Sequence, residues 1–254
     1  GLIEDNLVYN VDTYNNASYG SWNGTTCKPQ PENAAGLYDD GASYIWFEGN
    51  TVWNADQGIN LDVETNGKET DHLIVSDNLV HQDPGTSGSD PSTGPNPPGT
   101  RGESAVAGHD PYAMYIDAFG SNAAISAVYV YDNTFQNESQ HYLRPSDGMP
   151  VVDIGGIWSN VQVWHNTIEG MGTTDRYNPL FEVDNLPKAG GTETVNCNDY
   201  GDLSASGNTV NGNFAMPSND WLTLAGWQAG NKHGWDANSD VGAFSPNCPT
   251  SAIP

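Results

Sequence analysis

Six short segments of the chain repeat one pattern, and such a repeat constrains the architecture more than any other sequence feature. Each segment has alternating apolar residues and ends in Asn, which is followed by Thr or Leu and then by a second apolar residue. The segments are 1–6, 45–50, 73–78, 128–133, 161–166 and 203–208. Alternation with a period of two is typical of a strand with one buried face. The Asn falls where the strand must turn, because Asn tolerates left-handed backbone angles and its amide can bond to the chain.

Two more strands accompany each segment. The apolar residue two places after each Asn begins a second inward-facing strand, at Val8, Val52, Val80, Phe135, Ile168 and Val210. Another strand precedes most segments, at 36–40, 58–62, 113–117, 149–153 and 178–182. Three short strands per turn predict an all-β fold, a right-handed parallel β-helix (solenoid) with an Asn ladder and long inter-rung loops. An antiparallel two-sheet sandwich is the structural alternative.

With these strands and corners, the chain resembles the pectate-lyase-like superfamily of parallel β-helix repeat proteins over nearly its whole length. Trp227-Gln228 and residues 235–239 also resemble the closing segment of many secreted β-helix proteins. The resemblance implies a secreted, carbohydrate-active protein whose active-site groove lies on the face of the first strand of each turn. It identifies a fold more than an activity.

The repeat also divides the chain. We expect one domain over residues 1–254, with a long inter-rung loop at 83–112 and a C-terminal capping segment at 214–254. Residues 2–6 already form the middle strand of a turn, so the chain is interpreted as the C-terminal part of a longer solenoid. The alternatives are a cap folded from residues between 8 and 35, or a bare end that stacks on another subunit.

The charge balance excludes several partners. The chain has 7 Lys plus Arg against 32 Asp plus Glu, a formal net charge of −25. A nucleic-acid footprint and an anionic membrane surface both require basic residues, so neither is expected as a partner. So acidic a surface is typical of adaptation to high salt, where screening removes self-repulsion; a calcium-rich extracellular setting is the competing explanation.

Other signals concern location. No apolar run is long enough to cross a bilayer, and no basic-then-apolar leader is present, so we expect a secreted or cell-surface protein whose leader has been removed. Glycosylation acceptor patterns begin at Asn16, Asn23 and Asn137 and support secretion only weakly. Of the three cysteines, Cys197 and Cys248 could pair, which leaves the state of Cys27 open.

The strands that precede the Asn segments each end in a carboxylate, and these acids are the candidate catalytic site. By alternation they point outward, forming a column of Asp40, Asp62, Asp117, Asp153 and Glu182. Neighbouring strands lie ~4.8 Å apart, so carboxyl groups at one or two strand spacings suit glycoside hydrolysis. Close like charges also push one group toward its protonated form, as a general acid requires. We take Asp117 and Asp153 as the central pair, flanked by Asp62 and Glu182.

Several residues near the column are candidates for binding substrate. Tyr38 and Tyr115 should point out on the acid face, and His109, His141 and Arg144 should lie on loops beside it. Trp158 and Trp164 are also expected to be exposed by phase. No cofactor is required, but Asp40, Asp62 and Asp117 could instead hold calcium, which prefers several oxygen ligands. A solvated acidic surface without a ligand is the third interpretation.

The sequence therefore predicts a glycoside hydrolase that acts on an extracellular, neutral polysaccharide or glycan through paired carboxylates. A non-catalytic surface or fibre protein, self-assembling through its solenoid ends, is the first alternative. A calcium-dependent polysaccharide lyase is the second, with Arg144 or Arg176 as base. The pectin-hydrolase pattern of the superfamily is matched only at Asp39-Asp40, so that family is not supported.

Overall fold

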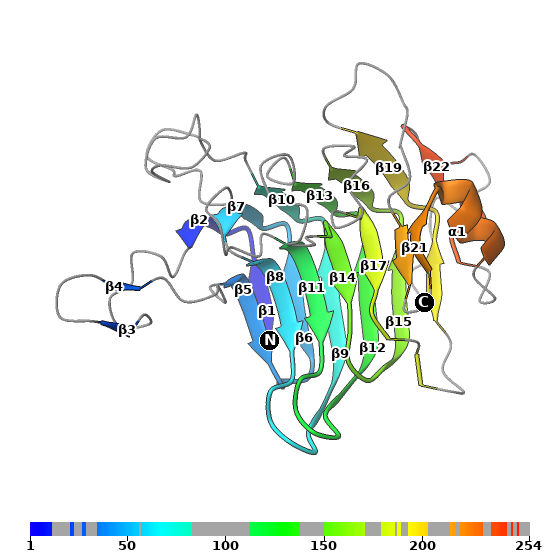
Figure 1. Ribbon diagram of the computed structural model, residues 1–254. Helices are drawn as coiled ribbons and strands as arrows, with labels where there is room; N and C mark the ends of the chain where they lie inside the picture. The colour runs from blue at the N-terminus through cyan, green and yellow to red at the C-terminus, as the bar shows by residue number, and fades with distance from the viewer. Residues whose placement is uncertain are drawn as a thin grey trace.

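The strands form three parallel sheets, and within each sheet they stack along one axis (Figure 1). The computed structural model describes residues 1–11, 21–22, 27–28, 35–55, 57–82, 112–137, 150–170, 179–185, 187–188, 193–202, 214–216, 219–230, 235–242, 245 and 248. All pairings within the three sheets are parallel except that of β20 with β21. This all-β arrangement is consistent with a parallel β-helix-like solenoid.

Each sheet takes one strand from each turn of the chain. The first sheet contains β5 (Ala35–Asp40), β8 (Gln57–Asp62), β11 (Tyr112–Asp117), β14 (Val152–Ile154), β17 (Phe181–Val183), β20 (Phe214–Met216) and β21 (Asn219–Leu222). The second contains β1 (Leu2–Glu4), β6 (Ile45–Glu48), β9 (Glu69–Ser76), β12 (Ala124–Tyr131), β15 (Trp158–Trp164) and β18 (Thr194–Asn196). The third contains β2 (Leu7–Val11), β7 (Thr51–Ala55), β10 (Leu79–Gln82), β13 (Thr134–Asn137), β16 (Thr167–Gly170), β19 (Asp199–Asp202) and β22 (Asp240–Val241). A separate hairpin joins β3 (Ser21–Trp22) to β4 (Cys27–Lys28).

The core is built from inward-facing residues that stack from one turn to the next. In the first sheet, Leu61 pairs with Ile116, and Ile116 pairs with Ile154. These side chains are fully buried, as are Val75, Val130 and their equivalents in the second sheet. Alternation within each strand turns the other side chains outward, which is what brings the acids of the first sheet onto one face.

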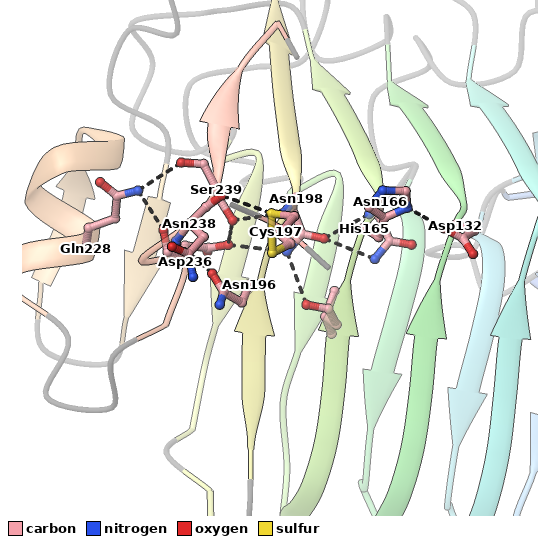
Figure 2. Close-up of a disulfide and its surroundings, with 12 residues drawn as sticks. Asp132, His165, Asn166, Asn196, Cys197, Asn198, Gln228, Asp236, Asn238 and Ser239 are labelled. Atoms are coloured by element: carbon pink, nitrogen blue, oxygen red, sulfur yellow. Dashed lines mark hydrogen bonds and ion pairs between the residues drawn. A yellow bond between two sulfur atoms is a disulfide. The ribbon is translucent and has the colours of Figure 1, made fainter. Parts of the chain in front are cut away.

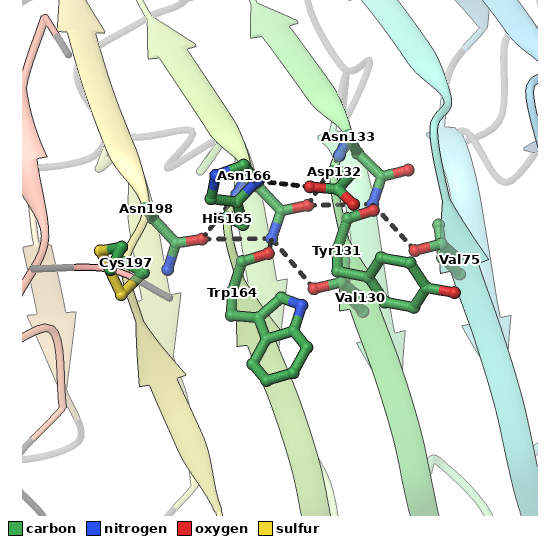
Figure 3. A network of polar contacts seen from close by, with 11 residues as sticks. Val75, Val130, Tyr131, Asp132, Asn133, Trp164, His165, Asn166, Cys197 and Asn198 are labelled. Carbon is green, nitrogen blue, oxygen red and sulfur yellow. Dashed lines mark hydrogen bonds and ion pairs between the residues drawn. A yellow bond between two sulfur atoms is a disulfide. The ribbon is translucent and has the colours of Figure 1, made fainter. Parts of the chain in front are cut away.

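A row of asparagine side chains runs along the corner between the second and third sheets (Figure 3). Asn133 donates through its backbone N–H and its Nδ2 to Asn166 Oδ1, at 3.1 and 2.9 Å. Each Nδ2 also donates to backbone carbonyls, as Asn133 does to Val75 and Tyr131. The same contacts repeat from Asn6 through Asn50, Asn78, Asn133 and Asn166 to Asn198.

The corner differs from the sequence expectation in two respects. The left-handed residue is the one before each Asn, for example Asp132 (φ 56°) and His165 (φ 53°), and not the Asn itself. The sixth corner of the row is Asn198, which follows β18, whereas the segment expected there, 203–208, lies outside the described residues. The sequence signal at Asn198 is weak, because Val195 alone marks the strand and Asp199 stands where Thr or Leu was expected.

At the C-terminal end, the Asn row stops at a buried carboxylate (Figure 2). Asp236 accepts hydrogen bonds from Trp227 Nε1 at 2.7 Å and from the Tyr200 hydroxyl at 3.0 Å. Asn198 donates its backbone N–H to Ser239 Oγ at 2.8 Å, and Ser239 in turn bonds to Asp236. Helix α1 (Leu224–Gly230) carries Trp227, which packs on Phe181 and Phe214 over the end of the core.

Three further placements concern residues singled out in the sequence. Cys197 and Cys248 form a disulfide. Trp158 is 1% exposed and belongs to the core, so the expectation that it is exposed was wrong, whereas Trp164 is half-buried. Asn137 is fully buried at the end of β13 and is therefore unsuited to glycosylation in the folded chain. Within the described ranges, no helix is long and apolar enough to span a membrane.

Candidate functional site

The acids of the first sheet lie in two neighbouring rows on its outer face. One row consists of Asp40, Asp62 and Asp117, which are paired across β5, β8 and β11. The other passes from Tyr38 through Asn60, Tyr115 and Asp153 to Glu182. Both rows face away from the core, because Ile59 and Leu61 of the same strand are in the core cluster.

The expected single column was therefore wrong in one detail. Asp153 pairs with Tyr115 and not with Asp117. Asp117 and Asp153 are instead diagonal neighbours on the same face, one strand and two residues apart. The shift of two residues leaves the outward direction of Asp153 unchanged, so alternation could not reveal it.

The acids at the edges of the site are exposed, and those at its centre are buried. Asp40 and Glu64 are exposed, whereas Asp62, Asp117 and Asp153 are 2%, 8% and 3% exposed. Within the described chain, Asp62 Oδ1 and Asp153 Oδ1 have no hydrogen-bond partner, and neither has Asn60 Oδ1. Such buried acceptors are uncommon in native proteins and require an explanation.

Burial raises the pKa of each central carboxyl group. Desolvation, followed by the charges of Glu64, Asp117 and Asp40, raises the pKa of Asp62 to about 7. The pKa of Asp153 lies well above its usual value, because of desolvation and the nearby Asp184, Glu182 and Asp117. The site is therefore suited to holding carboxylic acids in their protonated form near neutral pH.

Asp117 differs from Asp153 in its hydrogen bonds. Its Oδ2 accepts the Tyr115 hydroxyl at 2.7 Å, and its Oδ1 accepts the backbone N–H of Ala118. Burial raises the pKa of Asp117, but these two hydrogen bonds oppose that rise because they favour the carboxylate. Tyr115 is itself held by Tyr112, whose ring stacks on it at 4.9 Å. The ring of Phe119, which is 63% exposed, is tilted against the Tyr115 ring, with their centroids 5.9 Å apart.

Gly155 makes the space into which the Asp117 carboxyl group extends. A Cβ at Gly155 would lie 3.2–3.3 Å from the Asp117 carboxyl atoms, and one at Gly156 would overlap Oδ1. Gly155 donates its N–H to the Ile116 carbonyl, and Asp184 donates its N–H to the Ile154 carbonyl. These bonds continue the register, so Gly155 lies between Asp117 and Asp184 in one row.

Asp184 is a site residue that the sequence reasoning missed. It follows Glu182 by two residues, so the alternation that singled out Glu182 would also have found it. Asp184 is exposed, but partial desolvation by its neighbours raises its pKa; a hydrogen bond with Glu182 opposes this rise, and the charge of Asp117 adds to it. The two rows therefore bring Asp117, Asp153, Glu182 and Asp184 together.

The remaining candidates divide between described and undescribed residues. Tyr38 is 46% exposed on the acid face, and its hydroxyl donates to Glu64 Oε1 at 3.2 Å. Tyr115 lies on the same face but is buried. His109, His141, Arg144 and Arg176 lie outside the described residues, as does the expected loop except for Tyr112. Among the described side chains, no group of three or more His, Cys, Asp or Glu is arranged to hold a metal ion. Asp40, Asp62 and Asp117 therefore do not form such a group.

Comparison with models of known protein families finds no match to this chain. Comparisons with curated proteins and with solved structures also find no match.

Proposed function

We propose that the protein is an extracellular carbohydrate-active β-helix protein, a glycoside hydrolase whose central carboxyl groups are Asp117 and Asp153. In this proposal the three sheets close into a right-handed parallel β-helix of the pectate-lyase-like kind, with the Asn row as its ladder. The observation that carries the proposal is the pair of buried, neighbouring carboxyl groups whose surroundings differ. Hydrolysis of a glycosidic bond requires two carboxyl groups in different protonation states.

The surroundings assign the two roles. Asp153 accepts no hydrogen bond at Oδ1 and is surrounded by other acids, so it holds a proton and serves as the general acid. Asp117 accepts hydrogen bonds from Tyr115 and Ala118, so it is the one that ionises and serves as the base. Asp153 gives its proton to the leaving oxygen while Asp117 takes a proton from the attacking water.

The spacing favours attack by water. Residues two apart in a strand project from one face about 6.6 Å apart, which is the separation of Asp153 and Gly155. The Asp117 carboxyl group lies against Gly155, so it is separated from Asp153 by roughly that distance. A spacing of roughly 6.5–9.5 Å accommodates a water molecule and leads to inversion at the anomeric carbon.

The observations give less support to the alternatives. Stacking of solenoid ends would need an uncovered core surface after the last strands, but Trp227 and Trp235 are buried in the core cluster there. Lyase chemistry would need a basic residue beside the acids, and Arg144 and Arg176 lie outside the described residues. The disulfide suits the extracellular location that we propose, since disulfides persist in oxidising compartments.

The test is hydrolysis of a glycan panel by the purified protein, read by reducing-end release and by NMR of the product anomer. We expect release of reducing ends with an inverted anomer as the first product. A product with an unsaturated sugar would instead identify a lyase. No cleavage of any glycan, by a protein shown to be folded, would reject the proposed activity.

A further inference from the structure

The buried polar atoms that lack partners on the acid face are all hydrogen-bond acceptors. Asn60 Oδ1, Asp62 Oδ1 and Asp153 Oδ1 belong to side chains that are 4%, 2% and 3% exposed. The Nδ2 of Asn60 donates to Gln57 Oε1 at 2.6 Å, which orients its amide and leaves Oδ1 as the acceptor. A buried acceptor without a donor is costly, so a ligand that supplies donors would be stabilised here.

The charges around these atoms are of one sign. Asp40, Glu64 and Asp184 are exposed at the edges of the face, and Glu182 is half-buried. Tyr38 and Tyr115 donate their hydroxyls to Glu64 and Asp117, so even these groups are turned toward acids. Among the described residues, the ion pairs join Asp71 to His72 and Asp132 to His165, and neither pair lies on this face. The field at the face therefore attracts cations.

The arrangement of the acceptors excludes a compact metal cage among the described residues. No three of the described acids are grouped to hold a metal ion. The acceptors are instead spread over the face: Asn60 and Asp62 lie on β8, and Asp153 lies on β14, two strand spacings or about 9.6 Å away. An ammonium group carries one positive charge and three donors and has no acceptor. A polymer that carries several ammonium groups can supply donors to both β8 and β14.

We propose that the acid face binds a glycan whose sugars carry protonated amino groups, so that a polyglucosamine-type chain is its substrate class. Cleavage of that chain rests on the proposed function, whereas its binding does not. Phe119 and Tyr38, which are 63% and 46% exposed at the edges of the site, provide ring faces on which sugars can stack. The sequence alone favoured a neutral glycan, since it did not show which buried acceptors lack donors.

Binding of such a ligand should release protons. Burial raises the pKa values of Asp62 and Asp153, so these two carboxyl groups hold protons before a ligand binds. An ammonium ion beside them favours the carboxylate, so binding displaces protons into the buffer. A neutral sugar has no such effect.

The experiment is isothermal titration calorimetry of the full chain with a glucosamine hexamer and with its fully N-acetylated counterpart, at mildly acidic pH. The two ligands share one backbone and differ in the charge on nitrogen. We expect the glucosamine hexamer to bind at least about tenfold more tightly, with an observed enthalpy that changes with the ionisation enthalpy of the buffer. Equal or tighter binding of the N-acetylated hexamer would overturn the inference.

Two variants test whether binding depends on this site or only on the overall negative charge of the protein. Asp62→Asn removes a carboxyl group from the face, and Asp5→Asn removes one from the exposed corner before β2. Asp62→Asn should weaken glucosamine binding several-fold while Asp5→Asn leaves it unchanged; equal losses in both would overturn the proposed site. Binding of the glucosamine hexamer without cleavage would reject the proposed hydrolase activity and keep the proposed binding site. Cleavage of only the neutral hexamer would reject the amino-sugar assignment and keep the hydrolase.

Discussion

The Tyr115 hydroxyl donates to Asp117 Oδ2 at 2.7 Å, two residues along one face of β11. Both side chains are buried, at 8% exposure. This hydrogen bond favours the ionised form of Asp117, whereas Asp153 on the next strand has an oxygen with no partner in the described chain. Two neighbouring carboxyl groups therefore differ in their tendency to ionise, as acid and base catalysis requires.

Replacement of either carboxyl group should abolish turnover. We expect Asp117→Asn and Asp153→Asn each to lower kcat by about 10²–10⁴-fold, since each removes a group that transfers a proton. Circular dichroism should show both variants folded, because an amide fits the volume of the carboxyl group. Asp240→Asn, at an exposed position in β22, is the matched control. Wild-type turnover in both site variants would remove Asp117 and Asp153 from the mechanism.

Loss of the Tyr115 hydroxyl should shift the pH profile. Without this donor, the pKa of Asp117 rises further, because the carboxylate loses a stabilising hydrogen bond. A base with a higher pKa is ionised only at higher pH, so the acidic limb of the kcat/KM profile should move upward by about one pH unit in Tyr115→Phe. The profile is measured over the range in which the protein stays folded. An unmoved acidic limb would mean that Tyr115 serves packing only.

A buried acid near the N-terminal end should make stability depend on pH. Asp39 faces the core beside Leu61, is 5% exposed, and has a pKa raised by desolvation to about 6. Since its folded pKa lies above its unfolded value, the contribution of Asp39 is present at low pH and is lost as pH rises through about 6. Asp39→Asn should therefore raise Tm at pH above that value and change little at pH below about 4.

Thermal unfolding of both proteins across that range is the measurement. Asp40→Asn serves as control, since Asp40 is the exposed neighbour in the same strand. A Tm difference between wild type and Asp39→Asn that does not vary with pH would contradict the assignment.

The alternation of apolar residues predicted the strands well, because it is a local property of the sequence. All five expected strands that precede the Asn segments overlap strands of the first sheet. Residues with left-handed backbone angles within the second sheet interrupt this alternation. Asn160 (φ 53°) lies between Trp158 and Val161, so both side chains face the core although they are three residues apart. That break is why Trp158 was expected on the surface.

Alternation predicts whether a side chain faces outward, but it does not predict the register between turns. Shifting a strand by two residues preserves which side chains face out, so Asp153 was placed on the correct face but beside the wrong neighbour. The sequence also did not show that Gly155 makes room for the Asp117 carboxyl group, since this depends on which residue lies across from Gly155. Position along the stack depends on pairing between distant segments, and no single segment encodes it.

The Asp236 carboxylate should be essential for stability at the C-terminal end. Asp236→Ala would leave the buried donors of Trp227, Tyr200 and Asn198 without their acceptor. At about 1–3 kcal/mol for each unsatisfied buried group, we expect a loss of roughly 3–5 kcal/mol in the free energy of unfolding. Chemical denaturation measures it, with exposed Asp240→Ala as the control. A change in Asp236→Ala as small as in that control would show that the donors find other partners.

The cost of removing an asparagine should depend on its position in the row. Asn133 accepts from Asn78, donates to Asn166, and bonds to two backbone carbonyls, all in buried surroundings. Asn133→Ala therefore leaves buried groups on both sides without partners and should cost about 2–4 kcal/mol. Asn6→Ala removes equivalent bonds at an exposed end, where water can replace them, and should cost less than about 1 kcal/mol. Urea unfolding of the two variants tests the difference. Equal costs at the two positions would mean that burial does not set the strength of these bonds, and that the row stabilises each corner independently of its neighbours.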